Sequence, residues 1–293
     1  MTPSEKLHLL LKENGAVAFG AAPACEVDPQ DWERFQRWIA EGRHAGMTYM
    51  ENYPAIRRNP ALLLEGARTV ISIAFNYRQH NPIKGLATYA LGRDYHKVLG
   101  KRLKNVVREM RDEFEGEWRV CIDSAPILER YWAMKCRVGY RSSRHGNIVV
   151  PGVGSMVFLA ELITTLPPEM FPNRNPLPES YPEDCEQGKQ VCPTGALMPG
   201  GMVDARRCIN YLTIEKKEPL TSQERQMVGE AIFGCDICQR SCRYNRDDHP
   251  PVLPEFSPMD GLEDFLKGRN PEFPLSQSPL KRFGTVFAKN SGH

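Results

Sequence analysis

The chain has 293 residues, of which 41% are hydrophobic and 25% are charged, and its formal net charge at pH 7 is +2. These are ordinary values for a globular protein, and the length allows one large domain and a smaller one. No apolar run approaches the ~20 residues of a membrane span, so no membrane partner is expected. The nearly balanced charge indicates nothing for or against a nucleic-acid partner.

The N-terminal segment, residues 1–11, is polar and amphipathic and lacks the apolar stretch of a secretory signal. A cytoplasmic location is therefore expected, where cysteines stay reduced. Thiols or metal ligands are accordingly expected, rather than disulfides.

Helical and extended patterns alternate through the first half of the chain. Residues 70–75 form a short continuous apolar run, which predicts a buried central strand. Residues 156–166 are apolar enough for either a strand or a helix. The remaining predicted elements are helices at 4–13, 28–41, 98–114 and 126–134, and strands at 16–21 and 118–122. Such alternation predicts a layered α/β or α+β domain.

Six of the nine cysteines gather in the C-terminal half, with a spacing that is typical of two-cluster ferredoxins. In their pattern, C-x-x-C-x-x-C-x-x-x-C-P, three thiolates bind one cluster and the cysteine before proline binds the other. Counting back from Cys192, which Pro193 follows, the three earlier positions hold Gly188, Cys185 and Pro182. One cluster has thus lost two of its ligands.

The second half of the pattern is complete. Cys208, Cys235 and Cys238 reproduce the other triplet, with an insertion after its first member, and Cys192 supplies the fourth thiolate. We therefore predict one 4Fe–4S cluster held by these four cysteines. Cys185 and Cys242 are then free thiols or ligands of a labile partial cluster.

A zinc site and inert buried cysteines are the alternatives. Zinc sites usually use two C-x-x-C pairs or Cys/His pairs. This segment has one close pair, Cys235 and Cys238, and two distant single cysteines. The Cys-Pro-Thr-Gly turn at Cys192 also favours iron–sulfur binding.

Prolines are concentrated in residues 167–199 and again after 250, which indicates boundaries there. We predict a catalytic domain over residues 1–168 and a ferredoxin-like domain over 169–250. The remainder, 251–293, is expected to be an extension that packs back on the core.

A candidate acid follows the strand expected at 118–122. Asp123 ends this apolar strand just before Ser124, at the strand edge where α/β proteins place their sites. Aspartate is also a preferred helix N-cap, and Ser124 competes for that role. The residues alone leave capping and catalysis open.

Two further polar groups have ordinary structural interpretations. Asp94 can cap the helix that follows it, with His96 as a solvated first-turn residue. Arg130 can form a surface ion pair with Glu129. A solvated helix face is the expectation for the basic residues Lys101, Arg102, Lys104, Arg108 and Arg111.

Motifs along nearly the whole chain resemble those of the epoxyqueuosine reductase family, cobalamin-dependent iron–sulfur enzymes that complete queuosine in tRNA. No single motif is specific, but together they are. In chain order they are Gly42-Arg43-His44-Ala45-Gly46-Met47, Arg58-Asn59-Pro60, Tyr89-Ala90-Leu91-Gly92-Arg93-Asp94-Tyr95-His96, Asp123-Ser124-Ala125-Pro126-Ile127-Leu128-Glu129-Arg130, Phe158-Leu159-Ala160-Glu161, Cys208-Ile209-Asn210-Tyr211-Leu212-Thr213-Ile214-Glu215 and Gly234-Cys235-Asp236-Ile237-Cys238-Gln239.

The resemblance implies an α+β protein. Its first domain would be a nitroreductase-like α/β domain that binds base-off cobalamin, similar to the corrinoid domain of reductive dehalogenases. A bacterial ferredoxin-like domain would follow. The implied activity is the reduction of epoxyqueuosine to queuosine in tRNA, with electrons from one 4Fe–4S cluster and an external one-electron donor such as flavodoxin or ferredoxin.

The resemblance also assigns roles to residues. Asp123 matches the family's catalytic aspartate, which would protonate the departing oxygen. Asp94, Tyr95 and His96 would line the cobalamin and substrate pocket. Arg130 matches a pocket arginine that could pair with a corrin amide or a tRNA phosphate.

Three departures from the family keep a second function open. Residues 139–146 stand where the family has Gly-Trp-x-Gly-Lys-Asn, so the loop near the corrin is expected to be remodelled. Arg243 replaces the proline that normally follows the last cysteine, and the chain ends at His293 without a helical-repeat tail. The alternative is a corrinoid-handling protein that binds and reduces cobalamin and has no tRNA substrate.

Overall fold

A four-stranded antiparallel sheet lies at the centre of the protein, in the order β1-β2-β6-β3. The computed structural model describes residues 1–79, 82–172, 191–246 and 251–282. The strands of the sheet are β1 (Ala18–Pro23), β2 (Thr69–Asn76), β3 (Trp118–Cys121) and β6 (Val157–Thr164). The segment that fitted either state is thus a strand, and the antiparallel sheet with its helices confirms the α+β class.

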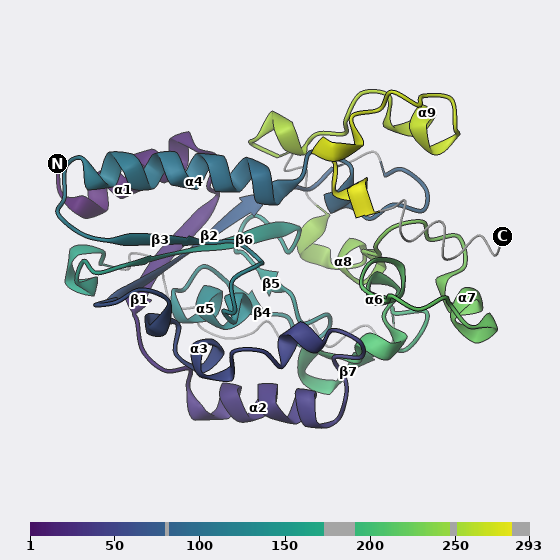
Figure 1. Ribbon diagram of the computed structural model, residues 1–293, viewed down its shortest axis with the longest axis horizontal. Coiled ribbons are helices and arrows are strands. Elements are labelled where there is room, and N and C mark those ends of the chain that lie inside the picture. The colour runs from purple at the N-terminus through teal and green to yellow at the C-terminus, as the bar shows by residue number, and fades with distance from the viewer. Residues whose placement is uncertain (80–81, 173–190, 247–250, 283–293) are drawn as a thin grey trace.

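Helices cover both faces of the sheet (Figure 1). One face carries α1 (Pro3–Glu13) and α4 (Tyr95–Arg111), and the other carries α5 (Glu129–Lys135), with α2 (Pro29–Ala40) and α3 (Pro54–Arg58) beyond it. Helix α1 begins at a capping box, in which the Thr2 hydroxyl accepts from the Glu5 N–H and the Glu5 carboxylate accepts from the Thr2 N–H. This reciprocal pair satisfies two N–H groups that a helix start otherwise leaves open.

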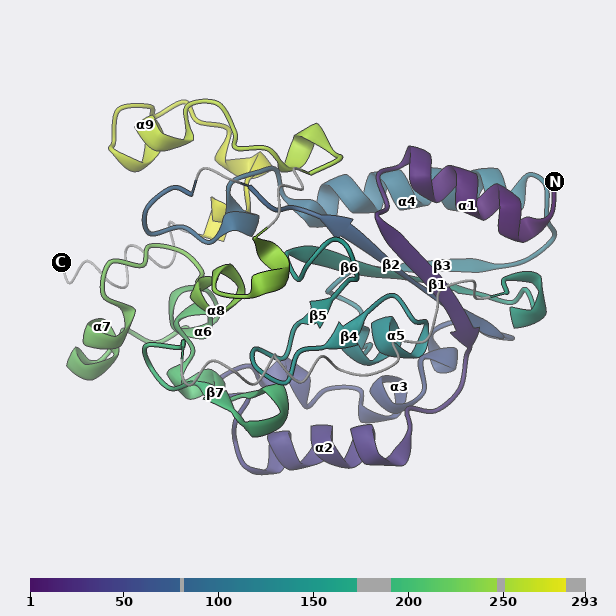
Figure 2. The ribbon, with the colours of Figure 1, turned by 180° about the vertical axis from the view of Figure 1, so that it is seen from behind.

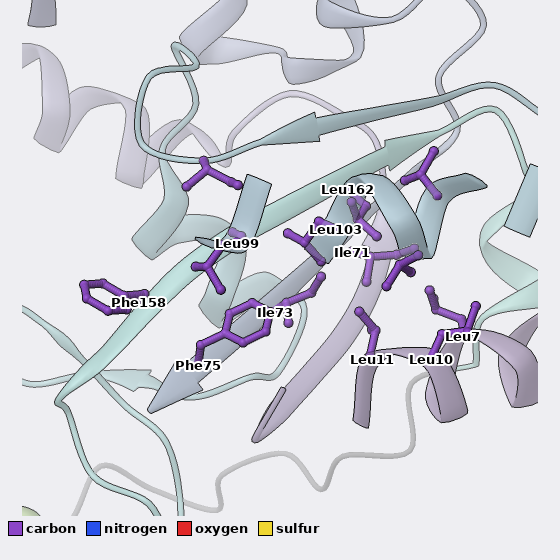
Figure 3. Close-up of a cluster of buried hydrophobic side chains, with 14 of the residues drawn as sticks. Leu7, Leu10, Leu11, Ile71, Ile73, Phe75, Leu99, Leu103, Phe158 and Leu162 are labelled. Carbon is purple, nitrogen blue, oxygen red and sulfur yellow. The ribbon is translucent and has the colours of Figure 1, made fainter. Parts of the chain in front are cut away.

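Strand β2 is central because it is apolar on both sides, and all eight of its residues are buried. Ile71, Ile73 and Phe75 face the helices α1 and α4, where they meet a row of buried leucines (Figure 3). Val70 and Ala74 face α5 on the opposite side. Each such side chain contributes about 1.5–3 kcal/mol of burial free energy, which makes this strand the anchor of the fold.

Smaller elements complete the chain, and Figure 2 shows them from behind. They are the hairpin of β4 (Tyr140–Arg141) and β5 (Ile148–Val149), the hairpin of β7 (Leu197–Met198) and β8 (Met202–Val203), and the helices α6 (Ile209–Ile214), α7 (Ser222–Val228), α8 (Ile237–Arg240) and α9 (Leu262–Leu266). In the part of the chain that the structure describes, no helix is long and apolar enough to cross a membrane.

The cysteine-bearing segment is joined to the sheet by specific hydrogen bonds. The Ala87 N–H donates to the Phe233 carbonyl at 3.0 Å, and the Gln239 amide donates to the Ser155 carbonyl at 2.7 Å. The expected domain boundaries near residues 168 and 250 stay predictions, because 173–190 and 247–250 lie outside the described residues.

Residues 251–282 pack against both parts. Leu253 and Phe256 enter the core beneath α4, while Phe273 and Leu280 contact Phe233 and its neighbours. This segment therefore holds the sheet and the cysteine-bearing part together.

Helix α5 begins at Glu129, three residues later than the sequence predicted. The preceding residues form tight turns instead, in which the Ser124 N–H donates to the Ile122 carbonyl and the Ile127 N–H donates to the Ala125 carbonyl. The hydrogen bonds of these turns satisfy backbone N–H and carbonyl groups that a longer helix would have paired.

Candidate active site

The two polar motifs predicted from sequence meet at one place. Asp94 and His96 lie at the start of α4, and Asp123 lies just beyond the end of β3. The His96 imidazole joins them: Nδ1 is 2.8 Å from Asp94 Oδ1, and Nε2 is 2.9 Å from Asp123 Oδ2. The sheet is antiparallel, so this is no shared carboxyl edge of the kind expected for α/β proteins. The junction of α4 and β3 creates the site instead.

Asp94 has the capping role that the sequence suggested, and its pocket-lining role stays a prediction because it is not among the residues that line the adjoining cavity. It caps α4 by accepting from the His96 N–H, and its buried carboxylate also forms an ion pair with Lys281. Burial alone would raise the pKa of Asp94, but hydrogen bonds from His96 and Lys281 outweigh this and hold it well below its usual value. Asp94 is therefore a fixed negative charge, and it anchors the distant C-terminal segment to the site.

His96 is an imidazolium ion at neutral pH. Desolvation alone would lower its pKa, but hydrogen bonds to Asp123 and Asp94 raise it to about 9. Both ring nitrogens then donate, so neither is available to bind a metal. His96 lies in the first turn of α4, as its ordinary interpretation had it, but the ring also bridges two carboxylates.

Asp123 is not a helix cap. Helix α5 starts six residues later, and its N-cap Leu128 makes no side-chain cap bond. Asp123 adopts a positive φ of 50°, which is costly for a residue with a side chain, and its N–H donates to Glu129 Oε1 at 2.7 Å. Glu129 thus holds Asp123 in a strained turn. The Asp123 carboxylate is more than half exposed.

A cavity of about 180 Å³ adjoins these residues. One wall is aromatic: the rings of Tyr95 and Phe158 stack with centroids 4.2 Å apart, and those of Tyr77 and Phe158 are 4.5 Å apart. The lining residues are Tyr77, Tyr95, Asp123, Glu129, Arg130, Asn147, Ile148, Ser155, Val157, Phe158, Leu159 and Gln239. Carboxyl groups, a guanidinium group and aromatic side chains therefore line the same cavity.

Glu129 and Arg130 are adjacent in sequence and both line this cavity. Desolvation and the charge of Asp123 raise the pKa of Glu129 to about 7. Desolvation within the concavity lowers the pKa of Arg130, although its side chain is exposed at the mouth. No hydrogen bond joins the two side chains among the described residues. Arg130 thus lines the cavity without a bond to Glu129. The sequence had suggested Glu129 only as a surface partner of Arg130.

Four cysteines lie together beside the cavity. Burial first, and then the nearby Cys235, Cys208 and Cys192, raise the pKa of Cys238 to about 12. The four thiol groups are thus near enough for their charges to act on one another. The Ala196 N–H donates to Cys192 Sγ at 3.4 Å, and the Thr194 hydroxyl, which donates to the Arg207 carbonyl, lies 3.2 Å from the same sulfur.

The described residues contain no group that is arranged to hold a single metal ion. No three histidine, cysteine, aspartate or glutamate side chains in the described ranges lie close enough to share one metal ion. Each thiolate of a 4Fe–4S site binds a different iron, so such a site does not bring its ligands that close. Cys185 lies outside the described residues, and Cys242 is buried.

The cavity and the cysteines share a wall. Gln239, which lines the cavity, follows Cys238 directly, and the Tyr77 hydroxyl is 3.4 Å from Gln239 Oε1. Arg130 is near enough to Cys208 and Cys238 for their charges to affect its pKa. A group bound in the cavity would therefore lie next to the cysteine cluster.

A flat, amide-fringed macrocycle such as a corrin fits these surroundings. The aromatic side chains offer the ring an apolar wall, while Asn147 and Arg130 offer polar partners for its edge. No histidine is among the lining residues, so none competes for the metal of such a ring. A corrinoid is larger than 180 Å³ and would extend beyond the mouth of the cavity.

The loop that departs from the family pattern forms part of this wall. Residues 139–146 contain β4 and the turn that leads to β5, and the following Asn147 and Ile148 line the cavity. His145 is buried in the loop, where desolvation and two nearby arginines lower its pKa to about 4. The sequence predicted remodelling here but not that the loop would carry a neutral buried histidine.

Comparisons with known proteins agree with this site. Residues 57–124 match the family model "Epoxyqueuosine reductase QueG, DUF1730", and residues 182–245 match "4Fe-4S double cluster binding domain". The epoxyqueuosine reductase of Cyclobacterium marinum is 36% identical over 238 residues, which cover 78% of this chain and 75% of that protein.

Solved structures match over most of the chain. A crystal structure of epoxyqueuosine reductase with a tRNA-Tyr epoxyqueuosine-modified stem loop has a TM-score of 0.81 at 27% identity and covers 96% of this chain and 77% of that one. A Bacillus subtilis epoxyqueuosine reductase, with its catalytic aspartate loop swung out of the active site, has a TM-score of 0.76 at 28% identity, with 96% and 75% covered. This chain therefore belongs to the epoxyqueuosine reductase family and is an oxidoreductase with a 4Fe–4S cluster-binding domain.

Proposed function

We propose that this protein reduces epoxyqueuosine to queuosine in tRNA. Base-off cobalamin would lie in the cavity, and one 4Fe–4S cluster would be held by Cys192, Cys208, Cys235 and Cys238. The observation that carries the proposal is the position of one cavity between a carboxylate–imidazolium pair and the cysteine cluster. A reaction that needs electrons on one side and a proton on the other requires this arrangement.

Bound cobalamin would supply a strongly reducing, nucleophilic cobalt at the substrate ring. The protein's own part is to deliver a proton to the oxygen that leaves. The proton would be held by His96, whose Nε2 is 2.9 Å from Asp123 Oδ2, and would pass through the Asp123 carboxylate to the departing oxygen. His96 can do this at neutral pH because its pKa is about 9.

Other residues would prepare the site. Glu129 holds the Asp123 turn through its 2.7 Å hydrogen bond. Arg130 would bind a corrin amide or a substrate phosphate, since its guanidinium is exposed at the mouth. Tyr95 would keep its phenolic proton, because burial and the charge of Asp123 raise its pKa, and would bound the substrate together with Phe158.

The number of clusters is part of the proposal. The matching family model describes a double-cluster domain, but Pro182 and Gly188 stand where the first cluster's pattern requires cysteines. Both lie outside the described residues. We expect a single cluster that an external one-electron donor, such as flavodoxin or ferredoxin, reduces in the cytoplasm.

The test is single-turnover conversion of an epoxyqueuosine-modified anticodon stem loop, with cobalamin and a chemical reductant under anaerobic conditions. Asp123→Asn keeps the size of the side chain but cannot donate the proton, so its rate should fall ~100-fold to ~10,000-fold. Asp260→Asn makes the same change at an exposed position away from the site and should match wild type.

Cluster content and corrinoid binding should be normal in both variants. If Asp123→Asn keeps more than about a third of the wild-type rate, proton delivery by Asp123 is wrong. If wild type reduces cobalamin but leaves the stem loop unchanged, the protein is a corrinoid-handling protein.

A further inference from the structure

Helix α4 lies along β3, which forms one edge of the sheet, as Figures 1 and 2 both show. Side chains join the two elements at both ends: His96 contacts Asp123 just beyond the end of β3, and Arg111 donates to the Trp118 carbonyl at 3.2 Å at the far end. The surface along α4 therefore starts beside the active site.

Basic side chains recur along the exposed surface of α4. The residues Lys97, Lys101, Lys104, Arg108 and Arg111 are all exposed and recur at intervals of four and three residues, which places them on one stripe of α4. From the first to the last, the stripe spans about 21 Å of helix. A cavity of about 460 Å³ lies at its far end.

The middle of the stripe is not neutralised by the protein itself. Among the described residues, the side chains of Lys101, Lys104 and Arg108 take part in no hydrogen bond or ion pair. Only the ends are engaged, where Lys97 donates to the Ser276 carbonyl at 3.0 Å and Arg111 pairs with Glu117. Three adjacent cations without internal partners are available to bind an external anion.

The stripe lies on a side of α4 that adjoins β3. Lys104, Arg108 and Arg111 line the far cavity together with Trp118, Arg119 and Val120 of β3 and one carboxylate, that of Asp112. His96, at the start of α4, reaches Asp123 just beyond the end of β3. A ligand with regularly spaced negative charges could thus extend from the active site along α4.

We propose that this stripe binds the phosphate backbone of the RNA strand whose modified nucleotide occupies the active site. The inference rests on the proposed function, because it takes the substrate to be tRNA. A row of cations without base-reading geometry positions a nucleic acid through its phosphates and is insensitive to sequence. The sequence predicted only a solvated basic face on α4. This proposal instead assigns that face to RNA binding.

Binding of a fluorescein-labelled anticodon stem-loop RNA to the cluster-containing protein tests this, with anisotropy measured from 50 to 200 mM salt. The variant is Lys104→Gln with Arg108→Gln. The control is Lys12→Gln with Arg37→Gln, which removes two exposed cations from other helices. Each lost phosphate contact is worth about 5- to 8-fold at ~0.1 M salt. The stripe variant should therefore bind about 25- to 60-fold more weakly, with a salt slope lower by about 1.5, and the control should match wild type.

The inference is overturned if the stripe variant binds within threefold of wild type, if the control weakens equally, or if wild type does not bind the RNA. It is also overturned if the variant loses binding to phosphatidylserine vesicles and keeps RNA binding, because the stripe would then contact a membrane surface. Turnover separates this inference from the proposed function. At saturating modified stem loop, the stripe variant should keep kcat and raise KM. Stripe-dependent binding without conversion by wild type would leave the RNA surface standing and refute the reductase activity.

Discussion

Replacing His96 with glutamine should remove a pH-dependent part of the protein's stability. In the wild type the pKa of His96 rises from 6.5 to about 9 because Asp94 and Asp123 hold the imidazolium. A raised pKa stabilises the folded state fully below pH 6.5, and this stabilisation is lost as the pH rises through 9. Glutamine cannot titrate, so the variant should lack this loss.

The size of the effect follows from the pKa and the exposure of the ring. The rise from 6.5 to about 9 would correspond to about 3 kcal/mol in a dry site. The His96 side chain is 35% exposed, so solvent screening reduces the contribution to roughly 1–2 kcal/mol. Urea unfolding of both proteins at pH 6 and pH 10, followed by tryptophan fluorescence, measures the difference.

The quantity of interest is how much more stability the wild type loses between these pH values than His96→Gln does. Taking the difference removes the contributions of all other titrating groups. Equal losses in the two proteins would refute the bridging of His96 between the two carboxylates. So would an imidazole proton signal of His96 that titrates near 6.5.

Three other outcomes are expected. Anaerobically reconstituted protein should bind close to four irons and four sulfides per chain, and an iron count near eight would contradict the single cluster. Cys235→Ala should abolish the visible chromophore, whereas Cys185→Ala should keep it. Bound cob(II)alamin should give an electron paramagnetic resonance spectrum without axial nitrogen splitting, because no histidine lines the cavity, and a clear nitrogen splitting would show that a nitrogen ligand is present. Phe75→Ala should lower the free energy of unfolding by about 3–5 kcal/mol, since this ring is fully buried in the central strand, and a loss under 1 kcal/mol would show that the core is not centred there.

The sequence predicted the elements whose pattern is strong. Residues 70–75 are apolar on both sides, so a buried central strand was foreseeable, and β2 confirms it. Residues 156–166 were ambiguous because a fully buried strand and a buried helix have the same continuous apolar pattern. Pairing with β2 and β3, which no local pattern encodes, settles that segment as β6.

The active site was predicted in parts but not as an arrangement. Asp123 and His96 were candidates for separate reasons, yet their contact depends on how α4 packs beside β3. Lys281 reaches Asp94 from the far end of the chain, a distance over which sequence spacing carries no information. Glu129 was overlooked because its importance comes from a hydrogen bond to a strained backbone, which depends on the turn and not on residue type.

The most direct test of the central claim is the nucleoside content of tRNA from a strain that lacks this gene and has no other epoxyqueuosine reductase. We predict that mass spectrometry will find epoxyqueuosine in place of queuosine, and that the wild-type gene will restore queuosine while Asp123→Asn will not. Normal queuosine in the deletion strain, or equal restoration by Asp123→Asn, would contradict the assigned reaction and its acid.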